Sequence, residues 1–316
     1  MKQLFFFFFL WNWAVSAQDF SLVEQKVANY PKLTTVENLA KRIATDFGTK
    51  DLQVKATFYW IARNIRYDLD GYYNPKQKRI SFRYRNEQER LVKIQAIKDE
   101  IVNETLLTRK ALCEGYAQTI AKVCSILQIE NEVIKGYVRN SSNDINNPSK
   151  NSNHAWNAVK LNNKWVYIDA TWAAGIVNNG RWQPLFNNYY YNFPKTNYFK
   201  THYPESSLWQ LRIGRMEKED FYNQPIYHPN FLQSDLQLIF PKKGILNSNG
   251  PVTIRIKNLA LNQTVFFGYS GYRYAVKPDS ISTKNNVTTI TTTPPKNSKQ
   301  AFLIIDKDVM LEFLIQ

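Results

Sequence analysis

The segment from residue 154 to residue 172 constrains this fold most, because it predicts a β-hairpin that pairs a histidine with an aspartate. Two strand-like runs, HAWNAVKL and KWVYIDATW, flank Asn162 and Asn163, and an asparagine pair favours a tight turn. Since side chains alternate along a strand, a two- or four-residue loop makes His154 and Asp169 diagonal neighbours on one face. A three-residue loop would place them on opposite faces.

The two cysteines lie in a segment whose apolar spacing predicts a single helix over residues 112–129. Cys113 and Cys124 are therefore separated by roughly 16 Å along the helix axis, at ~1.5 Å per residue, whereas a disulfide needs Cα atoms within about 7 Å. We predict two unpaired thiols, with Cys124 in the apolar stripe as a core residue. Cys113 falls in the first turn, where the helix dipole and free N–H groups favour a thiolate.

Together, these residues predict nucleophilic chemistry. A thiol attacks a carbonyl carbon as the thiolate, a neighbouring imidazole takes its proton, and a carboxylate on the other ring nitrogen fixes the tautomer. We predict these three roles for Cys113, His154 and Asp169 respectively. The alternatives are an inert thiol near a helix end and an ordinary cross-strand polar pair.

Distinctive motifs surround the same residues. They are CEGYA from Cys113, GYVR from Gly136, HAWNAV from His154, WVYIDATW from Trp165, ATFYWIARNIRYD over residues 56–68, and NYFKTHYPESSLWQL over residues 197–211. These motifs, with the Cys, His and Asp motifs in that order along the chain, resemble the transglutaminase-like superfamily, and more narrowly its kyphoscoliosis-peptidase-like branch, over roughly residues 35–225. The last motif departs from the branch pattern, because Phe193-Pro194 stands where an aspartate-proline pair is usual.

The resemblance implies an α+β fold with a papain-like, transglutaminase-like core, in which a helix-borne cysteine packs on an antiparallel sheet. It implies acyl transfer through a thioester, with the triad at Cys113, His154 and Asp169. Water as acceptor gives a peptidase or amidase, and a lysine amine gives a protein crosslinker. The alternative is a catalytically silent binding module. For the oxyanion we expect the Cys113 N–H and a side-chain donor, with Tyr67 and Trp60 on the upstream helix as candidates.

The N-terminus predicts a cleavable signal peptide over residues 1–17. Lys2 supplies a positive charge, residues 4–10 are apolar, and Val15 and Ala17 are the small residues of a cleavage site. An uncleaved anchor is the alternative. No later segment reaches the ~20 apolar residues of a transmembrane helix. We therefore expect a secreted or periplasmic protein with no transmembrane segment after cleavage.

The formal net charge of +15 bears on possible partners. A basic surface attracts nucleic acid, anionic lipid or an acidic cell-envelope polymer, although a solvated surface is the ordinary alternative. The sequence has no zinc-finger spacing, RNA-binding aromatic motif or Gly-rich phosphate loop, so we expect no nucleic acid. We expect a protein or peptide substrate and, from the charge, an acidic envelope polymer as a further partner.

The sequence predicts neither a cofactor nor a metal. It has no evident calcium loop, and neither His202 nor His228 has a metal-ligand partner at useful spacing. Both histidines are therefore predicted to be structural.

The 316 residues, 44% hydrophobic and 21% charged, suffice for two domains. We predict helices over residues 20–65, with Thr35 as an N-cap, and over residues 86–103. The polar stretch 140–153 is expected to be a loop, and the aromatic stretch 178–203 to be a cap over the sheet or the lining of a groove. After residue 230 short strands alternate with turn residues. The predicted organisation is a signal peptide (1–17), a transglutaminase-like domain (18–230) and a β-sandwich-like C-terminal domain (231–316).

Overall fold

The computed structural model describes residues 20–75, 82–247 and 249–316. The predicted signal peptide and its cleavage site lie outside these residues. Within them, no helix combines the length and the apolar character that crossing a membrane requires.

The first part of the chain is helical, as predicted. Its helices are α1 (Ser21–Val27), α2 (Val36–Asp46), α3 (Lys50–Asn64), α4 (Leu69–Tyr73), α5 (Glu87–Thr108) and α6 (Cys113–Ile126). Thr35 is the N-cap of α2, because its hydroxyl accepts the Asn38 N–H at 3.2 Å. The upstream helix, which was expected to carry both Trp60 and Tyr67, ends before Tyr67. Ile65 is extended, and Arg66–Tyr67 form the short strand β1.

An antiparallel sheet packs against α6. Its strands, in spatial order, are β5 (Lys164–Ile168), β4 (His154–Leu161), β3 (Asn131–Val138) and β8 (His202–Pro204). The β4–β5 hairpin has the predicted two-residue loop, since Leu161 pairs with Lys164 and both intervening asparagines have positive φ. Asn157 on β4 donates to the Ala117 carbonyl of α6 at 2.9 Å. The predicted core, a cysteine-bearing helix on an antiparallel sheet, is confirmed.

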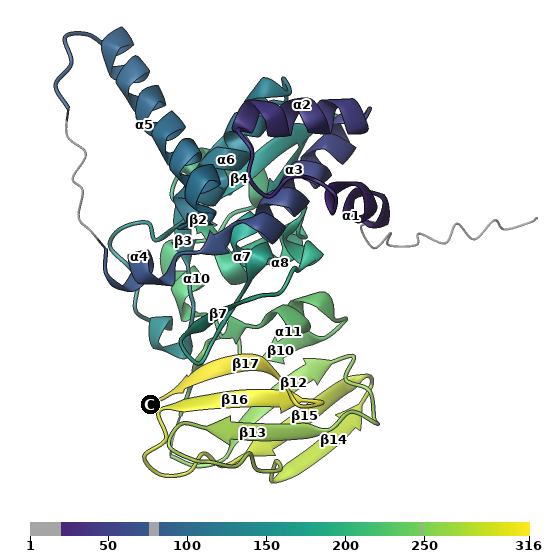
Figure 1. The fold of residues 1–316 in the computed structure, drawn as a ribbon. Helices are drawn as coiled ribbons and strands as arrows, with labels where there is room; N and C mark the ends of the chain where they lie inside the picture. The colour runs from purple at the N-terminus through teal and green to yellow at the C-terminus, as the bar shows by residue number, and fades with distance from the viewer. Residues whose placement is uncertain (1–19, 76–81, 248) are drawn as a thin grey trace, which may run out of the picture.

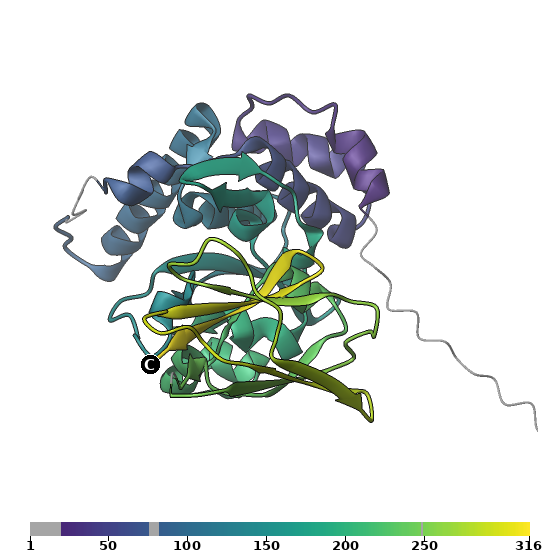
Figure 2. The same cartoon turned by 90° about the horizontal axis from the view of Figure 1, so that it is seen from below.

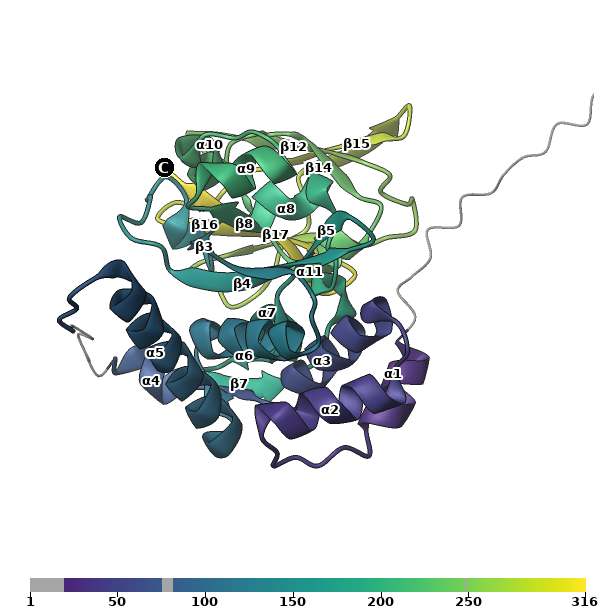
Figure 3. The same ribbon diagram turned by 90° about the horizontal axis from the view of Figure 1, so that it is seen from above.

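The aromatic stretch after the hairpin covers this sheet. It forms α7 (Ala170–Ala174), β6 (Gly175–Asn178), β7 (Arg181–Pro184), η2 (Asn188–Tyr190) and α8 (Lys195–Thr201). Tyr190, Tyr191, Phe193 and Tyr198 are buried in the same hydrophobic cluster as Trp156 of β4. These side chains therefore form core rather than the lining of a groove. In Figure 3, α8 lies on the opposite side of β4 from α6.

Two further sheets follow and fill the lower part of Figure 1. One contains β10 (Gln237–Phe240), β12 (Val252–Lys257), β15 (Val287–Thr292) and β14 (Ser280–Lys284). The other contains β11 (Ile245–Leu246), β17 (Asp308–Ile315), β16 (Gln300–Ile305) and β13 (Val265–Tyr269), with β9 (Ile226–Tyr227) beside β17. Their inner residues share one hydrophobic cluster, so the sheets pack face to face, as predicted for a sandwich (Figure 2).

The C-terminal sheets contact the first part of the chain through the predicted loop 140–153. Glu312 on β17 accepts the Ser142 N–H at 3.0 Å and bonds to His228 Nε2 at 2.8 Å. Strand β9, which precedes residue 231 in the chain, also pairs with β17 of the C-terminal sheets. The predicted boundary between residues 230 and 231 stays a prediction.

Candidate active site

Cys113 is the first residue of α6. The strand β2 (Lys110–Ala111) pairs in parallel with β1, opposite Tyr67, and leads directly into the helix. Leu112 is the N-cap and provides no side-chain cap. The Gly115 N–H already donates to the Leu112 carbonyl at 2.9 Å, which leaves the N–H groups of Cys113 and Glu114 for another acceptor. Cys113 is half-buried and unpaired. This position places a partly buried thiol at the positive end of a helix.

Cys124 differs from Cys113 in its burial and in its place near the other end of α6. It is fully buried and unpaired, and burial raises the pKa of its thiol to about 12. The predicted absence of a disulfide is confirmed.

His154 and Asp169 lie together, as the hairpin register predicted. His154 opens β4, and its Nε2 lies 2.6 Å from Asp169 Oδ2 with both side chains buried. The second strand is shorter than predicted, because the ladder ends at Ile168 and Asp169 caps α7. Its Oδ1 accepts the N–H groups of Thr171 at 2.9 Å and Trp172 at 3.1 Å. One carboxylate thus caps a helix and holds a histidine.

The electrostatic surroundings of His154 and Asp169 favour the charged form of each side chain. Burial opposes charge on His154, but Asp169 and then Cys113 outweigh it and raise the pKa of the ring to about 10. Burial also opposes charge on Asp169, yet His154 and His202 hold the pKa of its carboxyl well below its usual range. Because a charged carboxylate only accepts hydrogen bonds, His154 Nε2 carries a hydrogen, which leaves Nδ1 for Cys113.

His202 is a member of this cluster that the sequence prediction missed. Predicted to be structural and isolated, it lies fully buried on β8, with Nε2 3.0 Å from Asp169 Oδ2. Its sequence signal was the motif THYPE, within a segment that resembles a branch signature. His228, by contrast, lies at the contact with the C-terminal sheets.

The two candidate oxyanion donors occupy different environments. Tyr67 lies beside Cys113. Burial, and then the charge of Cys113, raises the pKa of its hydroxyl well above the ordinary value. A protonated phenol in that place can donate a hydrogen bond. Trp60 is buried in the main hydrophobic cluster. The structure therefore favours Tyr67, on β1 rather than on the predicted helix.

One group in the described residues has the composition and compactness of a metal site. His154, Asp169 and His202 each offer a ligand atom, all within 4.8 Å of one another. The distances of 2.6 Å and 3.0 Å from the histidine nitrogens to Asp169 Oδ2 are hydrogen-bond distances. In each histidine, Nε2 bonds directly to the carboxylate, so this nitrogen is not left for a metal ion. We therefore treat the group as a hydrogen-bond network.

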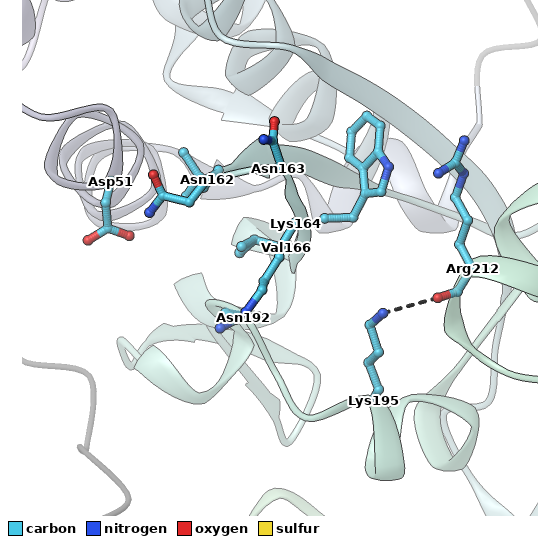
Figure 4. Close-up of a pocket in the computed structure, with 10 residues that line it drawn as sticks. Asp51, Asn162, Asn163, Lys164, Val166, Asn192, Lys195 and Arg212 are labelled. Carbon is cyan, nitrogen blue, oxygen red and sulfur yellow. Dashed lines mark hydrogen bonds between the residues drawn. The ribbon is translucent and has the colours of Figure 1, made fainter.

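Two cavities differ in their relation to the cysteine. One of about 350 Å³ is lined by the residue after Cys113, Glu114, together with Gln118, Lys135 and Trp209. Another, of about 700 Å³, lies at the Asn162-Asn163 turn of the hairpin (Figure 4). That turn is the end of β4 opposite to His154. Cys113, His154 and Asp169 line neither of these two cavities.

Comparison with known families agrees with the class that the fold indicates. Residues 37–170 match the transglutaminase-like superfamily. Members of this superfamily are typically cysteine enzymes.

The chain is also distantly similar to kyphoscoliosis peptidase. It is 25% identical to the Mus musculus protein over 249 residues, which cover 77% of this chain and 35% of that protein. It is 23% identical to the Homo sapiens protein over 251 residues, which cover 78% and 35%. The chain thus spans about a third of the length of these relatives. A solved structure titled "Crystal structure of a TGase" matches with a TM-score of 0.29 and 19% identity, covering 56% of this chain and 37% of that one.

Proposed function

We propose that this protein is a cysteine-dependent acyl-transfer enzyme that acts on protein or peptide amides. Cys113 is the nucleophile, His154 the base and Asp169 the carboxylate that orients the base. The observation that carries the proposal is the buried 2.6 Å contact between His154 Nε2 and Asp169 Oδ2, with Cys113 next to the ring at the start of α6. This arrangement meets the requirements of an activated thiol.

The reaction follows from these positions. The proton of the Cys113 thiol passes to His154 Nδ1, and the sulfur attacks the amide carbon. The N–H of Cys113 and the Tyr67 hydroxyl stabilise the oxyanion of the tetrahedral intermediate. His154 then gives its proton to the departing amine, which leaves a thioester on Cys113. Water, or a lysine amine, loses a proton to His154 and attacks the thioester, and the thiol re-forms.

Export is part of the proposal. Its support is the charge, the apolar run and the small residues within residues 1–17. The proposed location is secreted or periplasmic, and the proposed substrate is a protein or peptide. The basic charge of +15 supports an acidic envelope polymer as a further partner.

Selective alkylation tests the activated thiol. At neutral pH, iodoacetamide is expected to modify Cys113 and to leave Cys124 unmodified, as peptide mapping by mass spectrometry would detect. His154→Ala should slow the modification of Cys113 at pH 7 by at least ~10-fold, because an ordinary thiol reacts well only near pH 8.5. His228→Ala is the matched control and should leave the rate unchanged, since that histidine also contacts a carboxylate, but at the C-terminal sheets. An unchanged rate in His154→Ala would refute the proposal.

A further inference from the structure

His202 contacts the same carboxylate oxygen as His154, but it does so from β8, the edge strand at the other side of the sheet from β5. Strand β8 pairs with β3, so that His202 lies opposite Val138. From there its Nε2 reaches Asp169 Oδ2 at 3.0 Å, and its side chain is completely buried. The rings of His154 and His202 lie 5.6 Å apart, centroid to centroid. Two histidines thus converge on one oxygen atom.

The contact with His202 completes the hydrogen bonding of Asp169. Oδ2 contacts the two histidine nitrogens, and Oδ1 accepts the N–H groups of Thr171 and Trp172. A carboxylate offers about four acceptor positions, so all of them are filled. A buried carboxylate without water depends on such donors for its charge and its orientation.

The neighbours of His202 select its tautomer. Thr201 Oγ1 lies 2.8 Å from His202 Nδ1 and 3.3 Å from the Tyr198 carbonyl. Because the charged carboxylate of Asp169 only accepts, the single hydrogen of a neutral His202 lies on Nε2. Nδ1 then accepts from the Thr201 hydroxyl at 2.8 Å, in place of the longer bond that this hydroxyl can donate to the Tyr198 carbonyl. The chain of contacts therefore runs from Thr201 through His202 and Asp169 to His154.

We propose that His202 is a positioning residue, which Thr201 keeps as the neutral Nε2–H tautomer and which holds Asp169 charged and oriented toward His154. The inference rests on the proposed function and deepens it. A neutral donor serves this purpose better than a charged one, because a second positive charge would compete with the imidazolium of His154 for the same carboxylate.

The groups that surround His202 agree with a neutral ring. The titratable groups that face it are Asp169 at the N-cap of α7, His154 from β4 and Tyr198 from α8. Burial, partly opposed by Asp169, holds the pKa of His202 below its ordinary value. Burial also raises the pKa of the Tyr198 hydroxyl, so this phenol stays neutral.

The pH profile of Cys113 alkylation tests the proposal, with iodoacetamide as the probe between pH 4 and pH 9. His202→Leu removes one donor to Asp169, which weakens the imidazolium of His154. We expect the acid limb of the profile to move up by about one pH unit, a ~10-fold loss of rate on that limb. His202→Gln, whose amide also donates, should recover most of the rate. Thr201→Val should give a smaller shift in the same direction as His202→Leu.

His228→Leu is the matched control, because it removes a histidine–carboxylate contact of 2.8 Å outside the site. It should leave the profile unchanged. If His202→Leu does not fold, Thr201→Val carries the test. A wild-type profile in His202→Leu, or in Thr201→Val if His202→Leu does not fold, would overturn the inference. If wild-type Cys113 itself titrates like an ordinary thiol, the proposed function fails instead.

Discussion

At the scale of single residues, the site depends on how buried charges are compensated. Asp169 is completely buried, yet four donors surround it. His154 is buried as well, and Asp169 raises the pKa of its ring, which keeps the ring protonated despite burial. Each side chain would be costly to bury alone, because an unpaired buried charge destabilises a fold by several kcal/mol. The two are therefore stable as a pair, and changing one changes the other.

The raised pKa of His154 predicts how the pair contributes to stability. The folded-state value is about 10 and the ordinary value 6.5. His154 therefore contributes stability fully below about pH 6.5 and loses that contribution as the pH rises through 10. Urea unfolding of the wild type and of His154→Gln checks this. The difference in unfolding free energy should be largest below pH 6.5 and should shrink toward pH 10. A difference that grows with pH would contradict the assignment.

The sequence predicted the positions of three site residues but not that of His202. The proximity of His154 and Asp169 followed from strand alternation across one short turn, so local register was enough. The position of Cys113 at the start of α6 followed from helical spacing. His202 reaches Asp169 only because β8 pairs with β3, and those strands are separated by the whole hairpin and its aromatic extension. No local pattern encodes such a pairing.

At the scale of elements, the sheet positions the site through close backbone approach. Gly136 on β3 lies between His154 of β4 and Pro204 of β8. An added Cβ would lie 2.2 Å from the Tyr203 carbonyl oxygen and 2.6 Å from the Trp156 ring. The carbonyl belongs to the backbone of β8 and cannot move alone. Glycine at this position thus sets the distance between β8, which bears His202, and the rest of the sheet.

Gly136→Ala should therefore affect both stability and the site. We expect a loss of about 1–3 kcal/mol in unfolding free energy, as for other overpacked cores. Cys113 alkylation should slow in acid, because β8 and His202 are pushed away from Asp169. Gly48→Ala is the control, since nothing lies within 4 Å of its added Cβ, and should leave the alkylation rate unchanged. Wild-type stability in Gly136→Ala would show that the strands adjust without strain.

At the scale of the whole molecule, a few polar contacts join the C-terminal sheets to the rest of the chain. Glu312 accepts the Ser142 N–H across a separation of 170 residues and contacts His228. Gln300 also donates to Ser142 Oγ at 3.0 Å. The strands of the sheets were predictable from their alternating pattern. The contact with the loop 140–153 was not, because it depends on how distant parts of the chain pack.

Glu312→Gln tests this contact. Burial opposes its charge, but His228 and Ser142 hold the pKa of Glu312 below its ordinary value of 4.5. The carboxylate thus contributes stability above about pH 4.5 and loses it as the pH falls. We expect Glu312→Gln to cost ~1–3 kcal/mol of unfolding free energy at pH 7 and little at pH 3. Asp308→Asn, at an exposed position on the same strand, should have no such effect. An equal loss at both pH values would contradict the role of the charge.

The central claim is that Cys113 forms a thioester with the help of His154. It is tested most directly by rapid mixing of the protein with a nitrophenyl ester of a short acyl group at neutral pH, followed by mass spectrometry. The account predicts a burst of about one nitrophenolate per chain, as expected for a covalent intermediate. The acyl group should be found on Cys113, Cys113→Ala should show no burst, and His154→Ala should be much slower. Acylation of Cys113→Ala at the wild-type rate, or the absence of any adduct on Cys113, would contradict the claim.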